Sequence, residues 1–125
     1  MATLIVTHGT GVGRYFPLGR RTSVVGRDEG VLIQLPDPHV SRKHFQISFK
    51  PETALYYVVD MRSRHGTFVN GCRLIEWKEQ PLCNNDVIDA GGTTVLFTTE
   101  DFQDRDGALA YQKKVGERQE RTLTH

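Results

Sequence analysis

Three short stretches of this 125-residue chain together supply cationic side chains and hydroxyl groups, a combination suited to binding phosphate. They lie at residues 26–27, 41–44 and 63–71, where predicted strands meet loops. A phosphorylated side chain carries about two negative charges and three strong acceptor oxygens. A site for it therefore needs guanidinium groups, neutral donors and nearby backbone amides. The candidate donors in the three stretches are Arg27, Ser41, Arg42, Ser63, Arg64 and His65.

Catalytic interpretations of the same residues are weaker. Ser41 has His44 three residues away and Asp60 downstream, which admits a serine nucleophile. However, Ser41 does not lie in a Gly-x-Ser-x-Gly elbow, and nothing indicates an oxyanion hole. The five histidines are scattered without the spacing of metal ligands. We therefore predict no enzyme activity, no metal site and no cofactor.

A glycine-rich run at residues 9–13 has the composition of a dinucleotide-binding loop. That chemistry needs a helix directly after the glycines, so that backbone amides can meet a pyrophosphate. The residues that follow, 14–17, read instead as a strand. The run is therefore predicted to connect two strands of a hairpin.

Composition places the chain among single-domain globular proteins. A net charge of +1 argues against nucleic-acid binding, which depends on a basic excess. No apolar run approaches the length of a membrane span, and residues 2–8 read as a strand rather than a signal peptide. We expect a monomer without nucleic-acid or membrane partners, located in the cytoplasm or, in a eukaryote, the nucleus. Cys72 and Cys83 are expected to be free thiols, with a disulfide as the alternative.

Most of the chain reads as short β-strands separated by turns. The clearest strand is residues 44–50, where apolar and polar side chains alternate with period two. Asn70-Gly71 is the strongest two-residue hairpin signal. The absence of a convincing helix favours an antiparallel β-sandwich, with a closed barrel left open as an alternative. The other predicted strands are residues 2–8, 14–18, 21–26, 31–35, 55–60, 67–69, 73–75, 86–90 and 93–99.

The composition changes after residue 99. The segment 100–125 has few apolar residues and evenly mixed charge, and Gly107 interrupts it early. A frayed helix over residues 108–120 and a disordered segment fit this composition equally well. We therefore divide the chain into a domain at residues 1–99 and a tail at residues 100–125.

The ordered set of motifs resembles that of the forkhead-associated (FHA) domain. The hallmark of that family is Gly-Arg, then Ser-x-x-His, then Ser-x-Asn-Gly-Thr and a closing Asn-Gly. The resemblance covers residues 3–99, and its specificity comes from the order of the motifs on an all-β pattern. The matching residues are Gly26-Arg27, Ser41, His44, Ser63, Gly66-Thr67 and Asn70-Gly71.

The resemblance implies a β-sandwich of about eleven short strands that binds phosphothreonine proteins through loops at one end. A Ser/Thr kinase would add the phosphate to these partner proteins. Arg27 and Ser41 would contact the phosphate directly, and Arg42 and Arg64 would add phosphate or peptide contacts. Selectivity along the peptide would involve residues 37–40 and 91–92. The residues expected to support the site are Gly26, His44, Gly66, Asn70 and Gly71.

His65 departs from the family pattern, which usually has asparagine at this position. That asparagine holds the peptide backbone through one donor and one acceptor group. A neutral histidine offers the same two functions with a different reach, whereas a protonated one would add charge toward the phosphate. We include His65 in the phosphopeptide site, and expect it to alter the grip on the peptide backbone more than the phosphate contact.

The leading hypothesis is a non-catalytic module that recruits a partner after a Ser/Thr kinase has phosphorylated it. An alternative is a phosphorylation-independent scaffold that uses a sheet face or the tail for assembly. The two differ in one observable, because only the first predicts that binding depends on the phosphate.

Overall fold

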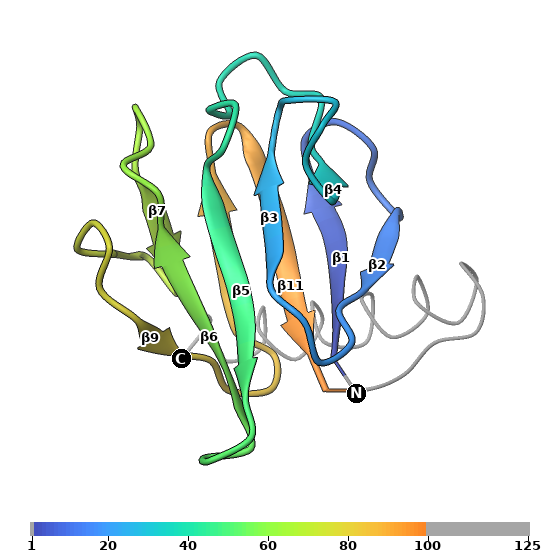
Figure 1. Cartoon of the computed structure of the whole chain (residues 1–125). Helices are drawn as coiled ribbons and strands as arrows, with labels where there is room; N and C mark the ends of the chain where they lie inside the picture. The colour runs from blue at the N-terminus through green and yellow to red at the C-terminus, as the bar shows by residue number, and fades with distance from the viewer. Residues whose placement is uncertain (1, 100–125) are drawn as a thin grey trace, which may run out of the picture.

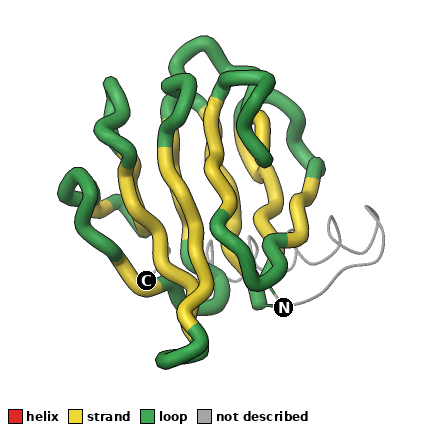
Figure 2. The backbone as a smooth tube through the Cα atoms, in the orientation of Figure 1, coloured by secondary structure: helices red, strands yellow, loops and turns green. Residues whose placement is uncertain are grey.

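The computed structural model describes residues 2–99, which form two β-sheets packed face to face (Figure 1). All regular structure among these residues is strand, and Figure 2 shows loops joining the strands at both ends of the sandwich. The first sheet contains, in spatial order, β2 (Tyr15–Pro17), β1 (Thr3–His8), β11 (Thr93–Thr98), β10 (Val87–Ala90), β7 (Thr67–Val69) and β8 (Cys72–Arg73). The second contains β4 (Ile33–Gln34), β3 (Ser23–Gly26), β5 (Phe45–Lys50), β6 (Leu55–Asp60) and β9 (Gln80–Pro81).

Side chains that alternate along the strands fill the space between the two sheets. In β5, Phe45 and Ile47 are fully buried, while the residues between and after them are partly exposed. This confirms the period-two pattern of that strand. Burial of such a side chain stabilises the fold by roughly 1.5–3 kcal/mol. The core also takes side chains from both sheets, including Leu4, Val6, Val25, Val58, Ile88, Val95 and Phe97.

Two predicted hairpins are confirmed. Asn70 and Gly71 have φ values of 51° and 83°, as a two-residue turn with the twist of the flanking strands requires. The glycine-rich run joins β1 to β2, and the amide of Gly13 donates to the carbonyl oxygen of Val6 at 2.9 Å. A strand follows these glycines in place of a helix, so the run is a hairpin connection.

Three details of the predicted strands are wrong. The strand expected at residues 73–75 is instead Cys72–Arg73, although the Leu74 amide still donates to the Thr67 carbonyl oxygen in the register of the β7–β8 pair. Strand β9 was not predicted, since two residues that include Pro81 carry no pattern; an edge position tolerates this proline. The β3–β4 pair is parallel, in a sandwich otherwise built from antiparallel pairs. Only two residues of β4 pair, so a short loop suffices to bring the chain back alongside β3.

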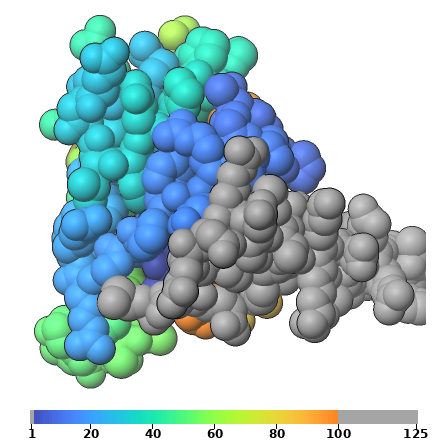
Figure 3. Space-filling view, turned by 90° about the vertical axis from the view of Figure 1, so that its right-hand side faces the viewer, coloured from blue at the N-terminus to red at the C-terminus, as the bar shows by residue number. Residues whose placement is uncertain are grey.

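The phosphate-related stretches gather at one end of the sandwich. The β3–β4, β4–β5 and β6–β7 loops lie together at the top of Figure 1, and the β5–β6 turn lies at the opposite end. The side view in Figure 3 shows that the N-terminal third of the chain, blue to cyan, forms this edge of the sandwich, to which β2 and β4 belong. The predictions made for residues 100–125 lie outside the described residues.

Gly26, the last residue of β3, lies directly against the backbone of the β4–β5 loop. A Cβ atom at this position would be 2.0 Å from the carbonyl oxygen of Arg42. The contact cannot open freely, because two backbone hydrogen bonds clamp it. The amide of Arg27 donates to the carbonyl oxygen of Ser41 at 2.9 Å, and the amide of Asp28 donates to the carbonyl oxygen of Arg42 at 3.2 Å. Glycine is therefore required for the close approach of two backbones.

The substitution Gly26→Ala is expected to lower the free energy of unfolding by roughly 1–3 kcal/mol or more, because the new methyl group forces the two segments apart. Urea denaturation monitored by tryptophan fluorescence measures this change. The matched control is Gly30→Ala, where the nearest atom to a new Cβ is Asp28 Oδ1 at 3.9 Å. Equal effects of the two substitutions would contradict the proposed steric role of Gly26.

Candidate functional site

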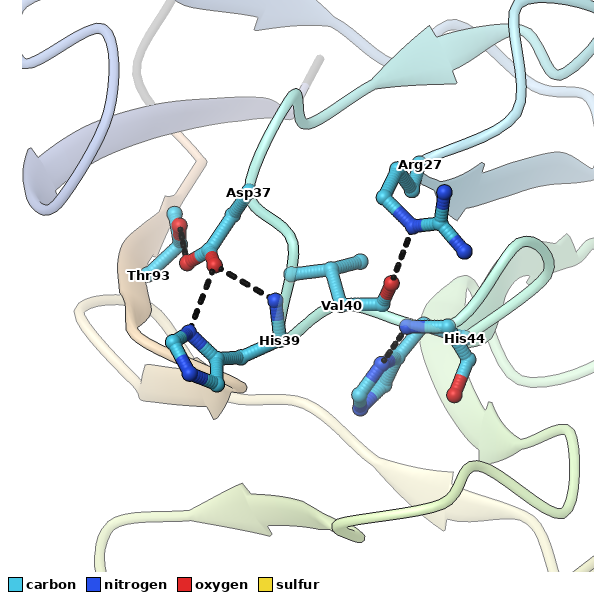
Figure 4. Close-up of polar contacts among 7 residues, drawn as sticks. Arg27, Asp37, His39, Val40, His44 and Thr93 are labelled. Carbon is cyan, nitrogen blue, oxygen red and sulfur yellow. Dashed lines mark hydrogen bonds and ion pairs between the residues drawn. The ribbon is translucent and has the colours of Figure 1, made fainter.

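Arg27 directly follows β3, at the end of the sandwich where the β3–β4, β4–β5 and β6–β7 loops gather, which is called the loop end below. Its side chain is exposed, and its Nε atom donates to the carbonyl oxygen of Val40 at 3.1 Å (Figure 4). Its own amide is bonded to the Ser41 carbonyl oxygen. The guanidinium is thus fixed at Nε, while its two terminal nitrogens have no partner in residues 2–99. A planar group held in this way presents two parallel donors to an oxyanion.

Ser41 connects the β4–β5 loop to the β6–β7 loop. Its Oγ atom accepts a hydrogen bond from the backbone amide of Arg64 at 3.0 Å. Because Oγ is the acceptor in this bond, the hydroxyl proton stays available for an outside acceptor. A hydroxyl donor therefore lies in the loop whose backbone is bonded to Arg27.

The buried side chain of His44 joins the β4–β5 loop to the β6–β7 loop. The ring is fully buried, and its Nδ1 accepts the backbone amide of Ser41 at 3.0 Å. Nδ1 therefore carries no proton, which assigns the proton to Nε2, and Nε2 donates to the Gly66 carbonyl oxygen at 2.8 Å. Burial lowers the pKa of His44 and outweighs the raising effects of the Gly66 bond and of Asp60. The neutral ring is thus the form that fits both bonds.

Asp60, at the end of β6, organises the β6–β7 loop. Its buried carboxylate accepts hydrogen bonds from the hydroxyl groups of Ser63 at 2.5 Å and Thr67 at 2.6 Å, and from the Ser63 amide at 3.2 Å. The expectation that Ser63 offers a donor to a ligand is wrong, because its hydroxyl is buried and turned to Asp60. The signal that was missed is an aspartate ending a β-strand just before closely spaced hydroxyl residues.

The same contacts bear on the serine-nucleophile alternative. The Ser41 hydroxyl is bonded to the Arg64 amide, and His44 meets Ser41 through its backbone amide rather than through Oγ. The carboxylate of Asp60 is bonded to Ser63 and Thr67 instead of the His44 ring. Ser41, His44 and Asp60 are therefore close neighbours that do not form the hydrogen-bond relay of a catalytic triad.

The remaining predicted ligand contacts lie on the exposed rim. Arg42, Arg64 and His65 are all exposed. The ring of His65 lies 6.3 Å, centroid to centroid, from that of His39 on the facing loop. Sequence reasoning placed the segment 37–40 near the peptide but did not single out His39. The structure thus brings two imidazoles together beside the Arg27–Ser41 pair.

His39 is held by Asp37, which is buried in the same loop (Figure 4). One carboxylate oxygen of Asp37 accepts the His39 amide at 2.8 Å and lies 3.3 Å from His39 Nδ1. The other accepts the Thr93 hydroxyl at 2.7 Å. Burial alone would raise the pKa of Asp37, but the hydrogen bonds from Thr93 and His39 lower it overall. An ionised Asp37 therefore ties the β4–β5 loop to the start of β11.

The predicted supporting glycines occupy positions that their backbone or surroundings require. Gly66 has a φ of 85°, and a Cβ there would be 2.7 Å from Nε of Arg73. Asn70 and Gly71 form the β7–β8 turn, and Oδ1 of Asn70 accepts the amide of Val87 at 2.9 Å. Gly66 thus shapes the loop directly after His65, whereas Asn70 and Gly71 shape the turn after β7.

Other kinds of site receive no support from residues 2–99. The described side chains contain no cluster of three or more potential metal ligands. Within the same part of the chain, no helix is long and apolar enough to cross a membrane. Cys72 and Cys83 are both free and exposed.

A β-sandwich that presents an anchored arginine and a serine hydroxyl at one end has the architecture of a domain that binds its ligand through loops. A family model of the FHA domain matches residues 23–91, which is more than half of the chain. The chain therefore belongs to the FHA domain family.

Curated relatives include longer proteins. The chain is 34% identical over 86 residues to the FHA domain-containing protein FhaA of Mycobacterium tuberculosis, covering 69% of this chain and 15% of FhaA. It is 33% identical over 109 residues to the glycogen accumulation regulator GarA of Mycolicibacterium smegmatis, covering 87% and 66%. It is 36% identical over 97 residues to the oxoglutarate dehydrogenase inhibitor of Corynebacterium jeikeium, covering 77% and 63%. The chain thus spans less than two thirds of each relative.

Solved FHA domains share the fold. One comes from a structural and functional study of phosphothreonine-dependent FHA domain interactions; it is 28% identical, with a TM-score of 0.69 over 81% of this chain and 98% of that one. The FhaA FHA domain, solved in complex with the intracellular domain of Rv3910, is 29% identical, with a TM-score of 0.67 over 78% and 99%.

The ring of His44 is expected to titrate below the ordinary histidine value of about 6.5, because burial disfavours its charged form. As the pH falls below about 6.5, the His44 ring becomes protonated in the unfolded chain but stays neutral in the folded state. The contribution of His44 to stability is therefore complete above this pH, and is lost as the pH falls toward the folded-state pKa. NMR titration of the ring measures the pKa, and a value at or above 6.5 would contradict the lowering of the pKa by burial.

Proposed function

We propose that this protein binds phosphothreonine-containing partners through the loop end of its sandwich, with Arg27 and Ser41 as the direct phosphate contacts. The observation that carries the proposal is the anchored guanidinium of Arg27 next to a serine hydroxyl with a free proton. The phosphothreonine-dependent interactions of a structural neighbour support the same ligand class. The partner is then a protein modified by a Ser/Thr kinase.

The geometry favours tight binding because it is formed before the ligand arrives. Hydrogen bonds to a charged group contribute roughly 1.5–3 kcal/mol each. The bond from Arg27 Nε to Val40 and the bond from the Arg64 amide to Ser41 Oγ restrict both contact groups. Less conformational freedom is therefore lost on binding, and more of the interaction energy appears as affinity.

The exposed residues around this pair are proposed to hold the rest of the ligand. Arg42, which follows Ser41, and Arg64, whose amide donates to Ser41 Oγ, add positive charge to the site, and both are free of ion pairs in the described part of the chain. His65 is proposed to contact the peptide backbone, with its neighbour His39 limiting the orientation of its ring. This arrangement supports recognition of a phosphate within a peptide.

The names of the relatives support a non-catalytic role. FhaA is described by its FHA domain, GarA as a regulator, and the Corynebacterium protein as an inhibitor of a dehydrogenase. We propose that this chain likewise acts by binding a partner in the cytoplasm, and that it carries out no reaction itself.

The substitution Arg27→Ala is expected to weaken binding of a phosphothreonine peptide by roughly 2–5 kcal/mol. This loss corresponds to an increase in Kd of roughly thirty- to several-thousand-fold, measurable by isothermal titration calorimetry. The matched control is Arg21→Ala, an exposed arginine in the β2–β3 loop. If Arg27→Ala keeps the parent affinity while remaining folded, the phosphate site lies elsewhere.

The substitution Ser41→Ala removes one hydroxyl donor and is expected to raise Kd roughly ten- to 150-fold, the equivalent of a single charge-assisted hydrogen bond. Fluorescence anisotropy of a labelled phosphothreonine peptide measures this change. Ser48→Ala in β5 serves as the control, since its half-buried hydroxyl has no hydrogen bond in residues 2–99. An unchanged Kd for Ser41→Ala would remove this hydroxyl from the phosphate site.

Binding to an oriented phosphothreonine peptide library, with phosphoserine and unmodified versions as controls, tests the function as a whole. The proposed function requires that removing the phosphate abolishes measurable binding and that excess inorganic phosphate competes. Equal affinity for phosphorylated and unmodified peptides would instead support a phosphorylation-independent scaffold.

A further inference from the structure

An open hollow of about 320 Å³ adjoins the proposed phosphate contacts on the side of the β3–β4 loop. Arg27 and Arg42 contribute to its lining, so it is continuous with the candidate site. The other lining residues are Asp28, Glu29 and Gln34. The hollow therefore combines both signs of charge directly beside the proposed phosphate contacts, within reach of a residue that flanks the phosphothreonine.

The charges that line this hollow are not paired with one another. Among residues 2–99, no ion pair joins Arg27 or Arg42 to either carboxylate. Asp28 Oδ1 accepts the amide of Gly30 at 3.2 Å, which holds the turn of the loop. Glu29 is exposed and has no hydrogen bond or ion pair in the described part of the chain. Its carboxylate is free to meet a ligand.

Unpaired carboxylates beside a phosphate site oppose the binding of a bare phosphate. Two like charges near one another repel, even when water weakens the effect. A ligand that carries a cation next to its phosphate reverses the sign of this interaction, because the phosphate meets the arginines while the cation meets the carboxylates. An acidic residue at the same position would be repelled, which is a means of selecting between partners.

We propose that Glu29, together with Asp28, selects phosphothreonine partners that carry a lysine or arginine beside the phosphorylated residue. The inference rests on the proposed phosphothreonine function, and adds the chemistry of the preferred partner. Glu29 is the main determinant, since the Asp28 carboxylate is already engaged with Gly30.

The preference is tested with phosphothreonine peptides in which one flanking position at a time is lysine, alanine or glutamate. Exposed charge pairs contribute little each, so the parent is expected to bind the best lysine peptide about two- to fivefold more tightly than the matching glutamate peptide. Glu29→Lys is expected to invert this ratio. Raising the ionic strength should bring the ratio toward one, because salt screens exposed charges.

The matched control is Glu52→Lys, which makes the same change of charge in the β5–β6 turn at the opposite end of the sandwich (Figure 1). It is expected to keep the lysine-to-glutamate ratio of the parent. The ratio within each variant is the readout, because it cancels the general gain in phosphate attraction from an added lysine.

The outcomes separate the two levels of the proposal. Phosphate-dependent binding with no lysine preference, or with a preference that Glu29→Lys leaves unchanged, would overturn the role of Glu29 and leave the phosphothreonine function intact. Parent protein that binds phosphorylated and unmodified peptides equally would overturn both. An inverted ratio in Glu29→Lys, with the parent ratio retained in Glu52→Lys, supports the inference.

Discussion

The buried ring of His44 is the contact on which the candidate site depends. Through its two nitrogens it joins the amide of Ser41 in one loop to the carbonyl oxygen of Gly66 in another. Both bonds require the neutral ring with its proton on Nε2, and burial favours that form. A single uncharged side chain inside the sandwich thus sets the separation of two exposed loops.

The other loop contacts repeat this principle with backbone groups and buried carboxylates. Gly26 lets β3 touch the β4–β5 loop directly, which brings Arg27 beside Ser41. Asp60 closes the β6–β7 loop, and Asp37 ties the β4–β5 loop to β11. Because these polar groups are satisfied inside the protein, the arginines and the Ser41 hydroxyl proton are left facing solvent. The buried groups that support the loops and the exposed candidate donors are therefore different side chains.

Charge at this end of the molecule is local. The chain as a whole has a net charge of +1, so it gains little from long-range attraction to a phosphorylated partner. The proposed recognition therefore rests on short contacts with Arg27 and Ser41, and on the unpaired charges next to them. The carboxylates at residues 28 and 29 lower the local positive potential, which in the proposed function favours selectivity over indiscriminate anion binding.

The sequence by itself determined what depends on local pattern: the alternating strands, the Asn70-Gly71 turn, the all-β class, and the ordered motifs that resemble the FHA family. These features are legible because side-chain period and turn chemistry act over a few residues. Only the tertiary structure decided which donors face outward. The Ser63 hydroxyl turns inward to Asp60, and Ser41 Oγ meets the Arg64 amide 23 positions away, a pairing without a local signature. The parallel β3–β4 pair and the two-residue β9 were likewise decided by neighbouring strands, because so few residues carry no pattern of their own.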